Sequence, residues 1–442
     1  MQIGTEKTEF HAAAENASWI IGGKIVKALL MLLVIALQAR YLGPERYGLL
    51  RYAESLTVFA APLMKMGLDS TLVHELIRRK EREGEVLGTA IAMNLLSALL
   101  SIAGIFVFVS FTNAGERETS VVCMLYSASL LFQAVEMLQF WFQAKLLSKY
   151  FSIATAVSYA AMAAVQVLLA LGGCSVQWFA VASVLEYAGI AVILLAVYRQ
   201  KSSESFRVSF PLGCEMLKAS GVFILSNVML VLYEETDRIM LELMRGSGAV
   251  GQYAAATTCA TMFSFVFAAV IYSARPGLFE RAERSGEAFD KGLAELYSLV
   301  LFSSLAVCVL VAVFAPVIIR VLYGMAYIEA TPTLRLAVWL TTFSYVGAIR
   351  DIWLLVKGKQ HLLLAVNLSA AVLNIGLNLL LIPIWGILGA AFASVATQIF
   401  ATVIVGFLLP QLRENNRLIV WALKPKTAIT AFQKAVGAFW RD

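Results

Sequence analysis

The sequence predicts an all-α integral membrane protein with about twelve transmembrane helices, arranged as two parallel six-helix bundles around a central cleft. Of its 442 residues, 60% are hydrophobic and 14% are charged, whereas soluble proteins carry about 25% charged residues. The 51 residues 362–412 include no Asp, Glu, Lys or Arg. Because about 20 apolar residues cross a bilayer core of roughly 30 Å, this run is long enough for two crossings. Pro383 to Gly386 stand where the reversal between them is expected.

Apolar runs bounded by charges or turn residues define the individual spans. The seventh span is the least apolar, because it contains Glu234, Glu235, Asp237 and Arg238. The predicted spans are 17–39, 48–67, 88–111, 120–142, 150–172, 176–197, 218–241, 250–272, 295–319, 333–356, 361–384 and 387–409.

The Lys and Arg residues between these spans predict the orientation of the chain. Twenty-three of them fall at or near one end of the spans, six fall at or near the other end, and six lie deeper within spans. Because cytoplasmic loops carry the excess of Lys and Arg, both termini are expected to be cytoplasmic. The formal net charge of +6 then follows from topology, and the expected partners are membrane lipids with no nucleic acid.

Cysteine spacing gives no sign of a metal or redox centre. The five cysteines fall singly, without CxxC or metal-ligand spacing, so they are expected to be small residues of the helix cores. The sequence predicts no cofactor, and it predicts a proton or sodium gradient as the energy source of any transport. It contains no GxxxxGK[ST] loop, which argues against an ATP-driven pump.

Three matches in chain order indicate an internal duplication. Gly43 and Gly48 after the first span correspond to Gly246 and Gly251 after the seventh. In the fourth and tenth spans, Trp141 with Lys145 corresponds to Trp353 with Lys357; in the sixth and twelfth, 180–184 corresponds to 391–395. The predicted units are 1–210 and 211–412, followed by a tail, 413–442. Because six helices per half give both halves one topology, the arrangement favours alternating access.

Several stretches resemble the polysaccharide (O-antigen, Wzx-type) flippases of the multidrug/oligosaccharidyl-lipid/polysaccharide (MOP) exporter superfamily. The first is the loop Arg40-Tyr41-Leu42-Gly43-Pro44-Glu45-Arg46-Tyr47-Gly48; the others are 141–150, 236–240 with 250–253, and 374–391. The resemblance covers essentially the whole chain and implies a MATE-like fold in the inner (cytoplasmic) membrane. It also implies that the protein is no enzyme but flips undecaprenyl-diphosphate-linked oligosaccharides to the outer leaflet. A polymerase and a chain-length regulator of the same pathway are further implied partners.

Charges inside spans are the candidate binding residues, because each costs about 2.5–3.5 kcal/mol on insertion scales and usually faces a cavity. A diphosphate carries about two negative charges, and cationic side chains lower its barrier in a low-dielectric region. The substrate-binding candidates are Lys24, Lys27, Arg51, Asp237 and Arg238. Snorkelling lysines and an internally paired cluster in the seventh span are the structural alternatives.

Four acids are candidates for proton or sodium coupling, namely Glu54, Glu136, Glu186 and Glu234. Glu54 follows Arg51 by three residues, so the two can pair on one helix face. Intramembrane amides are expected either to line a hydrophilic cleft or to bond neighbouring helices. They are Asn94, Asn227, Asn367, Asn374, Asn378, Gln133, Gln139 and Gln143.

The tail has its own periodicity. Ile429, Phe432, Val436 and Phe439 follow helical spacing with basic residues nearby, which predicts an interfacial helix on the cytoplasmic leaflet. A helix that docks a partner is the alternative.

Three other functions stay open at this point. A drug exporter of the same superfamily is expected to carry acids rather than Lys24 and Lys27 in its first helix. A lipid II flippase typically has fourteen helices against twelve here. A membrane polysaccharide polymerase needs a sizeable external loop, whereas the predicted outer loops are about 3 to 14 residues long.

Overall fold

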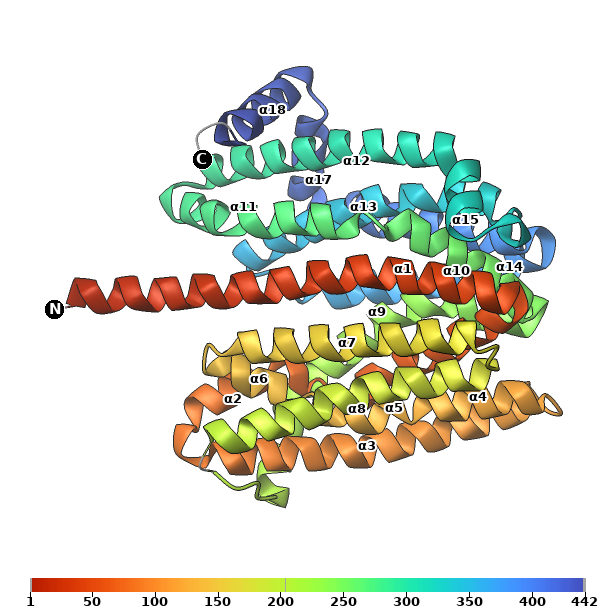
Figure 1. The fold of residues 1–442 in the computed structure, drawn as a ribbon. Helices are drawn as coiled ribbons and strands as arrows, with labels where there is room; N and C mark the ends of the chain where they lie inside the picture. Colours follow the sequence, from red (N-terminus) through yellow and green to blue (C-terminus); the bar gives the residue numbers. More distant parts are fainter. Residues whose placement is uncertain (1, 203, 440–442) are drawn as a thin grey trace. The chain divides into compact units, whose positions relative to one another are not determined.

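The computed structural model describes the backbone of residues 2–202 and 204–439, and the side chains of 31–202, 204–221, 224–225, 227–232 and 234–433. Over this part of the chain the structure consists of helices and short turns without a strand, so the all-α prediction is confirmed (Figure 1). The helices are α1 (Gln2–Lys65), α2 (Leu72–Arg78), α3 (Glu83–Thr112), α4 (Arg117–Ser127), α5 (Ser129–Val135), α6 (Leu138–Ala144), α7 (Ser148–Leu171), α8 (Val176–Lys201), α9 (Phe210–Arg245), α10 (Ser247–Thr261), α11 (Ser264–Arg284), α12 (Gly286–Leu322), α13 (Ala330–Val356), α14 (Leu362–Trp385), α15 (Ile387–Ile399), α16 (Val405–Leu408), α17 (Arg413–Ala422) and α18 (Pro425–Phe439).

All twelve predicted spans fall on these helices. Among the described residues, eight helical segments are long and apolar enough to cross a membrane. The other four predicted spans lie in α1, which holds two of them, and in α9 and α13, which carry more charge. The predicted reversal after Pro383 is also present, because α14 ends at Trp385 and α15 begins after Gly386, whose φ is 56°.

Gly43 divides α1 into two arms, which correspond to the first two predicted spans. Its φ of 70° and ψ of 171° interrupt the helix, and only glycine adopts a positive φ without a steric cost. Pro44 then opens the second arm, where its fixed φ suits a first helical position. Gly246 has a φ of 81° between α9 and α10, so the duplicated glycines share a backbone role.

The chain divides into two compact units, Met1–Gly251 and Gln252–Asp442. The first unit includes α9, which packs against α1. The predicted boundaries at 210/211 and 412/413 concern the duplicated halves and the tail, and they stay predictions.

The first unit is built around α1, α3, α7 and α8. α7 packs between α1 and α8, and α3 packs against α1, α4 and α5 (Figure 1). Its buried cluster lies toward the loops rich in Lys and Arg, and includes Leu87, Leu138, Trp141, Phe142 and Tyr198. This packing fixes α7 and α8, which supply one side of the pocket described below.

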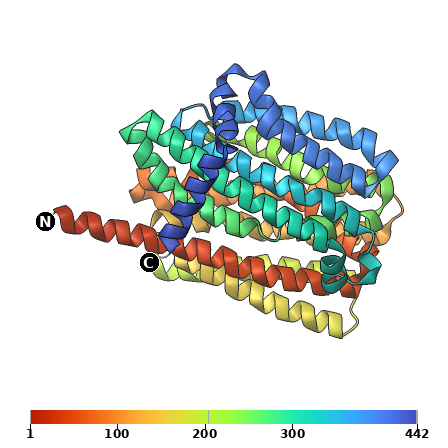
Figure 2. The ribbon, with the colours of Figure 1, turned by 90° about the horizontal axis from the view of Figure 1, so that it is seen from above.

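The second unit is built around α12 and α13, with α14 and α15 packed against each other. Both C-terminal helices, dark blue in Figure 2, contact α12. Tyr297 of α12 donates a 2.9 Å hydrogen bond to Asn415 Oδ1, and Asn416 Nδ2 donates a 2.9 Å bond to the Val403 carbonyl. The first part of the tail, α17, is therefore docked by buried side chains.

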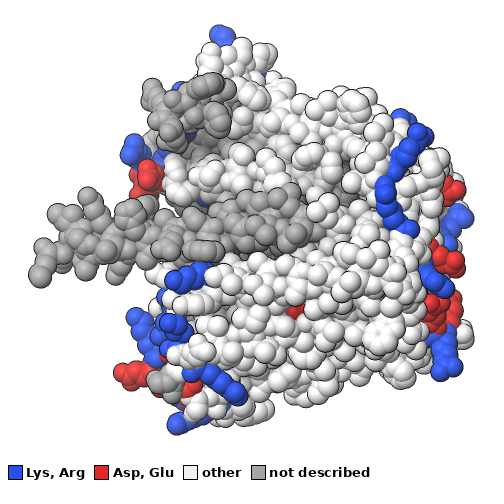
Figure 3. Space-filling view, in the orientation of Figure 1, with Lys and Arg blue, Asp and Glu red and all other residues white. Residues whose placement is uncertain are grey.

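Charged side chains gather at the helix ends of each unit. On the face that Figure 3 shows, the surface between the ends is almost entirely uncharged. Large apolar side chains are exposed along the membrane-length helices, as expected where lipid replaces water. Those more than half exposed include Leu99, Leu100, Phe106, Leu168, Val192, Val313 and Leu380.

Candidate functional site

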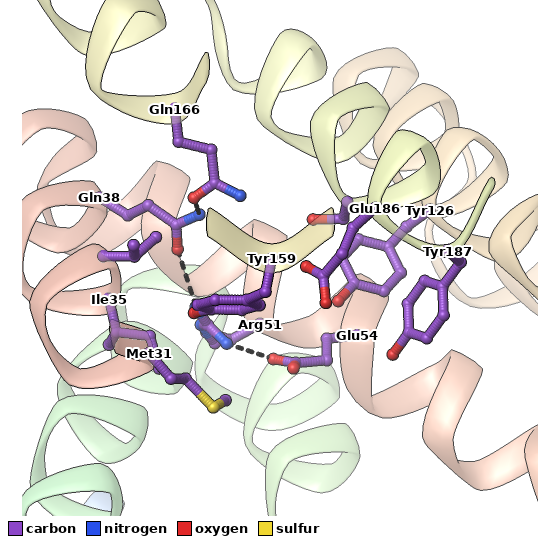
Figure 4. A pocket seen from close by; sticks show the side chains of 12 residues that line it. Met31, Ile35, Gln38, Arg51, Glu54, Tyr126, Tyr159, Gln166, Glu186 and Tyr187 are labelled. Atoms are coloured by element: carbon purple, nitrogen blue, oxygen red, sulfur yellow. Dashed lines mark hydrogen bonds and ion pairs between the residues drawn. The ribbon is translucent and has the colours of Figure 1, made fainter. Parts of the chain in front are cut away.

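A small polar cavity lies inside the first unit. Its volume is about 80 Å³, and residues of α1, α4, α7 and α8 line it (Figure 4). Since one water needs roughly 10–15 Å³ of such space, the cavity has room for several waters but not for an oligosaccharide. The lining residues are Met31, Val34, Ile35, Gln38, Arg51, Glu54, Tyr126, Tyr159, Gln166, Ser183, Glu186 and Tyr187.

Arg51 is the cation of this cavity, and its side chain joins the two arms of α1. Its Nη1 donates to Glu54 Oε2 at 2.5 Å, and its Nη2 donates to Gln38 Oε1 at 2.8 Å. Gln38 Nε2 in turn donates to Gln166 Oε1 of α7 at 2.6 Å (Figure 4). The kink at Gly43 makes the bond between Arg51 and Gln38 possible, because it brings residue 38 of one arm near residue 51 of the other.

The guanidinium of Arg51 is buried and held on several sides. Arg51 is only 9% exposed, and its Cζ lies 5.0 Å from the centre of the Tyr47 ring. That distance is within the range of cation–π attraction. Its Nε is buried without a hydrogen-bond partner among the described residues. Because a guanidinium has five N–H donors, Arg51 retains capacity for a further acceptor.

The opposite wall of the cavity carries a second carboxylate among tyrosines. Glu186 of α8 is 8% exposed, and Figure 4 shows it beside Tyr126, with Tyr159 and Tyr187 nearby. The charged lining residues are thus one arginine and two glutamates.

Three sequence-predicted site residues therefore meet in one cavity, namely Arg51, Glu54 and Glu186. The predicted pairing of Arg51 with Glu54 is confirmed by their 2.5 Å contact. Glu136 follows α5 and acts electrostatically on Tyr187, so it lies near the same wall.

The other predicted residues are placed elsewhere or are not described. On α9, Arg238 Nη1 lies 3.0 Å from Glu235 Oε2, Asp237 is 3% exposed, and Glu234 is exposed. Within this segment Arg238 thus forms an ion pair with Glu235. The side chains of Lys24 and Lys27 lie outside the described residues.

Sequence reasoning missed the two amides that orient Arg51. Gln38 and Gln166 are separated by 128 residues, so no local spacing connects them. Two of the amides that were predicted, Asn374 and Asn378, instead bond to each other at 3.0 Å inside the second unit. Asn94 is fully buried in α3. A polar residue one helical turn before the Gly43 kink is the signal that could have drawn attention to Gln38.

The cavity brings one guanidinium together with carboxylate, amide and hydroxyl groups. Among the described residues, no three His, Cys, Asp or Glu side chains are placed to hold a metal ion. A guanidinium beside a carboxylate binds oxyanions bidentately when the carboxylate leaves. The same carboxylate, once unpaired and buried, favours a proton.

The sequence matches the family model of polysaccharide biosynthesis proteins over residues 13–280. The chain belongs to the polysaccharide biosynthesis protein family. A curated relative is an uncharacterized membrane protein of Methanocaldococcus jannaschii, which is 27% identical over 186 residues. That match covers 41% of this chain and 36% of the relative, so it spans about a third of the relative's length.

Solved structures of MOP superfamily transporters are similar in fold to this member of the family. The lipid II flippase MurJ, in an inward closed conformation, has a TM-score of 0.72 at 14% identity and covers 95% of this chain and 98% of its own. An inward-facing multidrug resistance MATE transporter has a TM-score of 0.64 at 15% identity, covering 88% and 94%. A MOP transporter from Pyrococcus furiosus, described as having a binding pocket of reverse polarity, has a TM-score of 0.61 at 14% identity, covering 91% and 95%.

These likenesses confirm the MATE-like fold and the resemblance to MOP exporters. The chain is a multi-pass membrane protein of the polysaccharide biosynthesis protein family with the fold of these transporters.

Proposed function

We propose that this protein flips undecaprenyl-diphosphate-linked oligosaccharides from the cytoplasmic to the outer leaflet by alternating access. The family and the flippase fold support a lipid-linked glycan as cargo. The observation that carries the proposal is the buried Arg51–Glu54 pair at the edge of a cavity. The cavity is too small for the glycan, so its part in the cycle concerns the diphosphate and the coupling ion.

Arg51 exchanges partners during the cycle in this proposal. A diphosphate oxygen competes with Glu54 for the Nη1 and Nε donors, because charge-assisted bonds to an oxyanion are at least as strong as those to a carboxylate. Gln38 keeps the guanidinium oriented through its 2.8 Å bond to Nη2. Glu54, released in a buried site that also holds Glu186, then takes up a proton, which links cargo to a proton gradient. Sodium at the same carboxylates is the other coupling ion.

The remaining predicted residues have proposed roles on the cargo's path. Lys24, Lys27 and Arg238 are expected to attract the diphosphate, while Asp237, Glu234 and Glu136 balance those charges. The termini are proposed to be cytoplasmic in the inner membrane, where a polymerase and a chain-length regulator act on the flipped product. Reporter fusions at residue 442 and in the 322–330 turn test this orientation.

Complementation of a flippase-null strain tests the role of Arg51. Arg51→Gln removes charge-assisted bonds of about 1.5–3 kcal/mol, so we expect activity to fall about 10- to 100-fold. Arg46→Gln is the matched control, because Arg46 is exposed on the same arm of α1, and it should retain activity.

A folding defect must be separated from a binding defect. Removing one partner of a buried ion pair leaves an unpaired charge, which destabilises the fold by about 3–5 kcal/mol. The double variant Arg51→Gln/Glu54→Gln removes both charges, so it should regain wild-type thermal stability and stay inactive. Full activity in the stable double variant would contradict the proposal.

A lipid II flippase is the second candidate, since its cargo carries the same diphosphate and the fold likeness to MurJ is high. Rescue of a strain depleted of its lipid II flippase distinguishes the two, because only this alternative restores growth.

A further inference from the structure

The end of α9 carries a buried carboxylate that the proposed transport cycle does not use. Glu242 is 7% exposed. Ser247 Oγ, at the start of α10, donates to Glu242 Oε1 at 2.7 Å. Its second oxygen, Oε2, is buried without a hydrogen-bond partner among the described residues. A charged carboxylate is destabilised in such a place, because burial removes the water that would hydrate Oε2 and no hydrogen-bond donor replaces it.

A second carboxylate, Glu116, acts on Glu242 electrostatically from the turn before α4. Glu116 is exposed, and its Oε2 accepts hydrogen bonds from Asn113 Nδ2 at 3.1 Å and Thr119 Oγ1 at 2.9 Å. The environments of the two glutamates therefore differ, because Glu116 is exposed and accepts two hydrogen bonds while Glu242 is buried. Negative charge on Glu116 opposes ionisation of Glu242.

Apart from Arg245, which is exposed three residues further along α9, two neutral titratable side chains lie near Glu242. Tyr52 of α1 and Cys123 of α4 both interact electrostatically with Glu242 and Glu116. The Tyr52 hydroxyl donates to Asn113 Oδ1 at 3.2 Å, so it is directed toward the Glu116 network. Neither Tyr52 nor Cys123 supplies a positive charge to Glu242.

We propose that Glu242 is a proton-binding site at the end of α9, which binds a proton on its buried Oε2 near neutral pH. The site lies at the ends of the helices opposite the loops rich in Lys and Arg, one residue beyond the predicted span 218–241. Its ligand is a proton, and loss of that proton leaves a buried charge that favours entry of water between α9 and α10.

The site is connected to a tight contact between α1 and α10. The Ser247 carbonyl oxygen lies only 1.7 Å from the place where a Cβ on Gly48 would be, and the Pro44 carbonyl lies 2.0 Å from that of Gly251. Any side chain larger than hydrogen is excluded from both positions. Because Ser247 makes this contact and also binds Glu242, a change in the charge of Glu242 acts directly on the contact. If the proposed flippase function holds, the proton therefore influences the opening of α1 from α10.

Infrared difference spectroscopy of the purified full-length protein tests the site without any transport assay. A spectrum taken between neutral and alkaline pH should show loss of the carbonyl band of a protonated carboxylic acid. The part of the band that Glu242 contributes should be absent in Glu242→Gln, which resembles the protonated acid in shape, so the band should be weaker than in the wild type. It should keep its wild-type intensity in Glu118→Gln, the matched control, because Glu118 is exposed at the same end of α4.

A second variant gives a shift rather than a loss. Ser247→Ala removes the donor that favours the charged form, so the band should disappear at a higher pH than in the wild type. A band of unchanged intensity in Glu242→Gln, or no protonated acid at neutral pH in the wild type, would overturn the proposal. A flippase assay that fails while the band behaves as expected would count against the proposed function only.

Discussion

The turn at 141–147 in the first unit and the turn at 353–359 in the second have the same backbone but different charge partners. In the first, Leu147 N donates to the Phe142 carbonyl and residue 146 has a φ of 56°. In the second, Lys359 N donates to the Leu354 carbonyl and Gly358 has a φ of 65°. Both are helix ends with a left-handed residue after the last turn. The offset is 212 residues at each position, so the duplication extends to individual hydrogen bonds.

The side chains above these turns differ. In the first unit, Glu83 Oε2 accepts from Trp141 Nε1 at 3.1 Å and lies 2.8 Å from Lys145 Nζ. The same offset aligns this set with Glu295, Trp353 and Lys357. There, Lys357 Nζ donates to Glu414 of α17 at 2.9 Å, and Arg281 lies 3.7 Å from Glu295.

The buried Nε1 of Trp353 is left without a hydrogen-bond partner among the described residues. The backbone of the turn is therefore the same in the second unit, but its lysine, Lys357, pairs with Glu414 of α17. Duplication conserves what the backbone requires, whereas side-chain pairing follows whichever element is docked nearby.

The largest expected effect separates the two tryptophans. Trp141→Phe removes a hydrogen bond to a charged acceptor, worth about 1.5–3 kcal/mol. Trp353→Phe loses similar volume but removes an N–H that already lacks a partner. We expect Trp141→Phe to be the more destabilising by about that amount, measured as the drop in apparent melting temperature under one detergent condition.

Equal losses in the two tryptophan variants would show that Glu295 does accept from Trp353 in solution. The comparison between the two side-chain sets would then be wrong, even though the backbone comparison would stand.

The second largest effect concerns the residues with positive φ, Leu146 and Gly358. Gly358→Leu gives the second turn the leucine that the first turn has at residue 146. We expect the free energy of unfolding to fall by about 1–2 kcal/mol, the cost of a left-handed L-residue. Nothing lies within 4 Å of a Cβ at this position, so the cost is conformational. Leu146→Gly should change stability by less than about 1 kcal/mol, because relief of strain is opposed by the greater freedom of glycine in the unfolded chain. A large loss in Leu146→Gly would indicate that the Leu146 side chain packs.

The smallest effect concerns the two lysines. A double-mutant cycle of Lys357→Met with Glu414→Gln should give a coupling energy below about 1 kcal/mol, because both side chains are partly exposed. The cycle of Lys145→Met with Glu83→Gln should give a larger value, since Glu83 is only 11% exposed. A larger coupling energy for Lys357 and Glu414 than for Lys145 and Glu83 would mean that the ion pair with α17 is the stronger of the two.

Much of the fold was predictable because hydropathy reports which helices face lipid. Helix ends were less so. α12 begins at Gly286, nine residues before its predicted start at residue 295, since a helix can continue beyond the bilayer until a cap ends it. Here Ser285 is that cap, with its side chain accepting a 3.1 Å hydrogen bond from Ala288 N.

The candidate site was predictable only where its contacts are local. Arg51 and Glu54 are three residues apart on one helix, and their pairing followed from spacing. Glu186 reaches them from α8, and the Glu83–Trp141 bond joins residues 58 apart, so neither contact has a signal in a single sequence. The offset that relates Trp141 to Trp353 also relates Glu83 to Glu295, and this alignment could have identified both acids.

The chain from Arg51 through Gln38 to Gln166 has one direction, because every donor in it points away from the guanidinium. Gln38 therefore cannot turn its amide over without breaking both bonds at once. The uncharged side chain of Gln38 thus connects the second arm of α1, through Arg51, with the middle of α7, through Gln166. A new partner for Arg51 in place of Glu54 would therefore act on a hydrogen-bond chain that reaches Gln166 of α7.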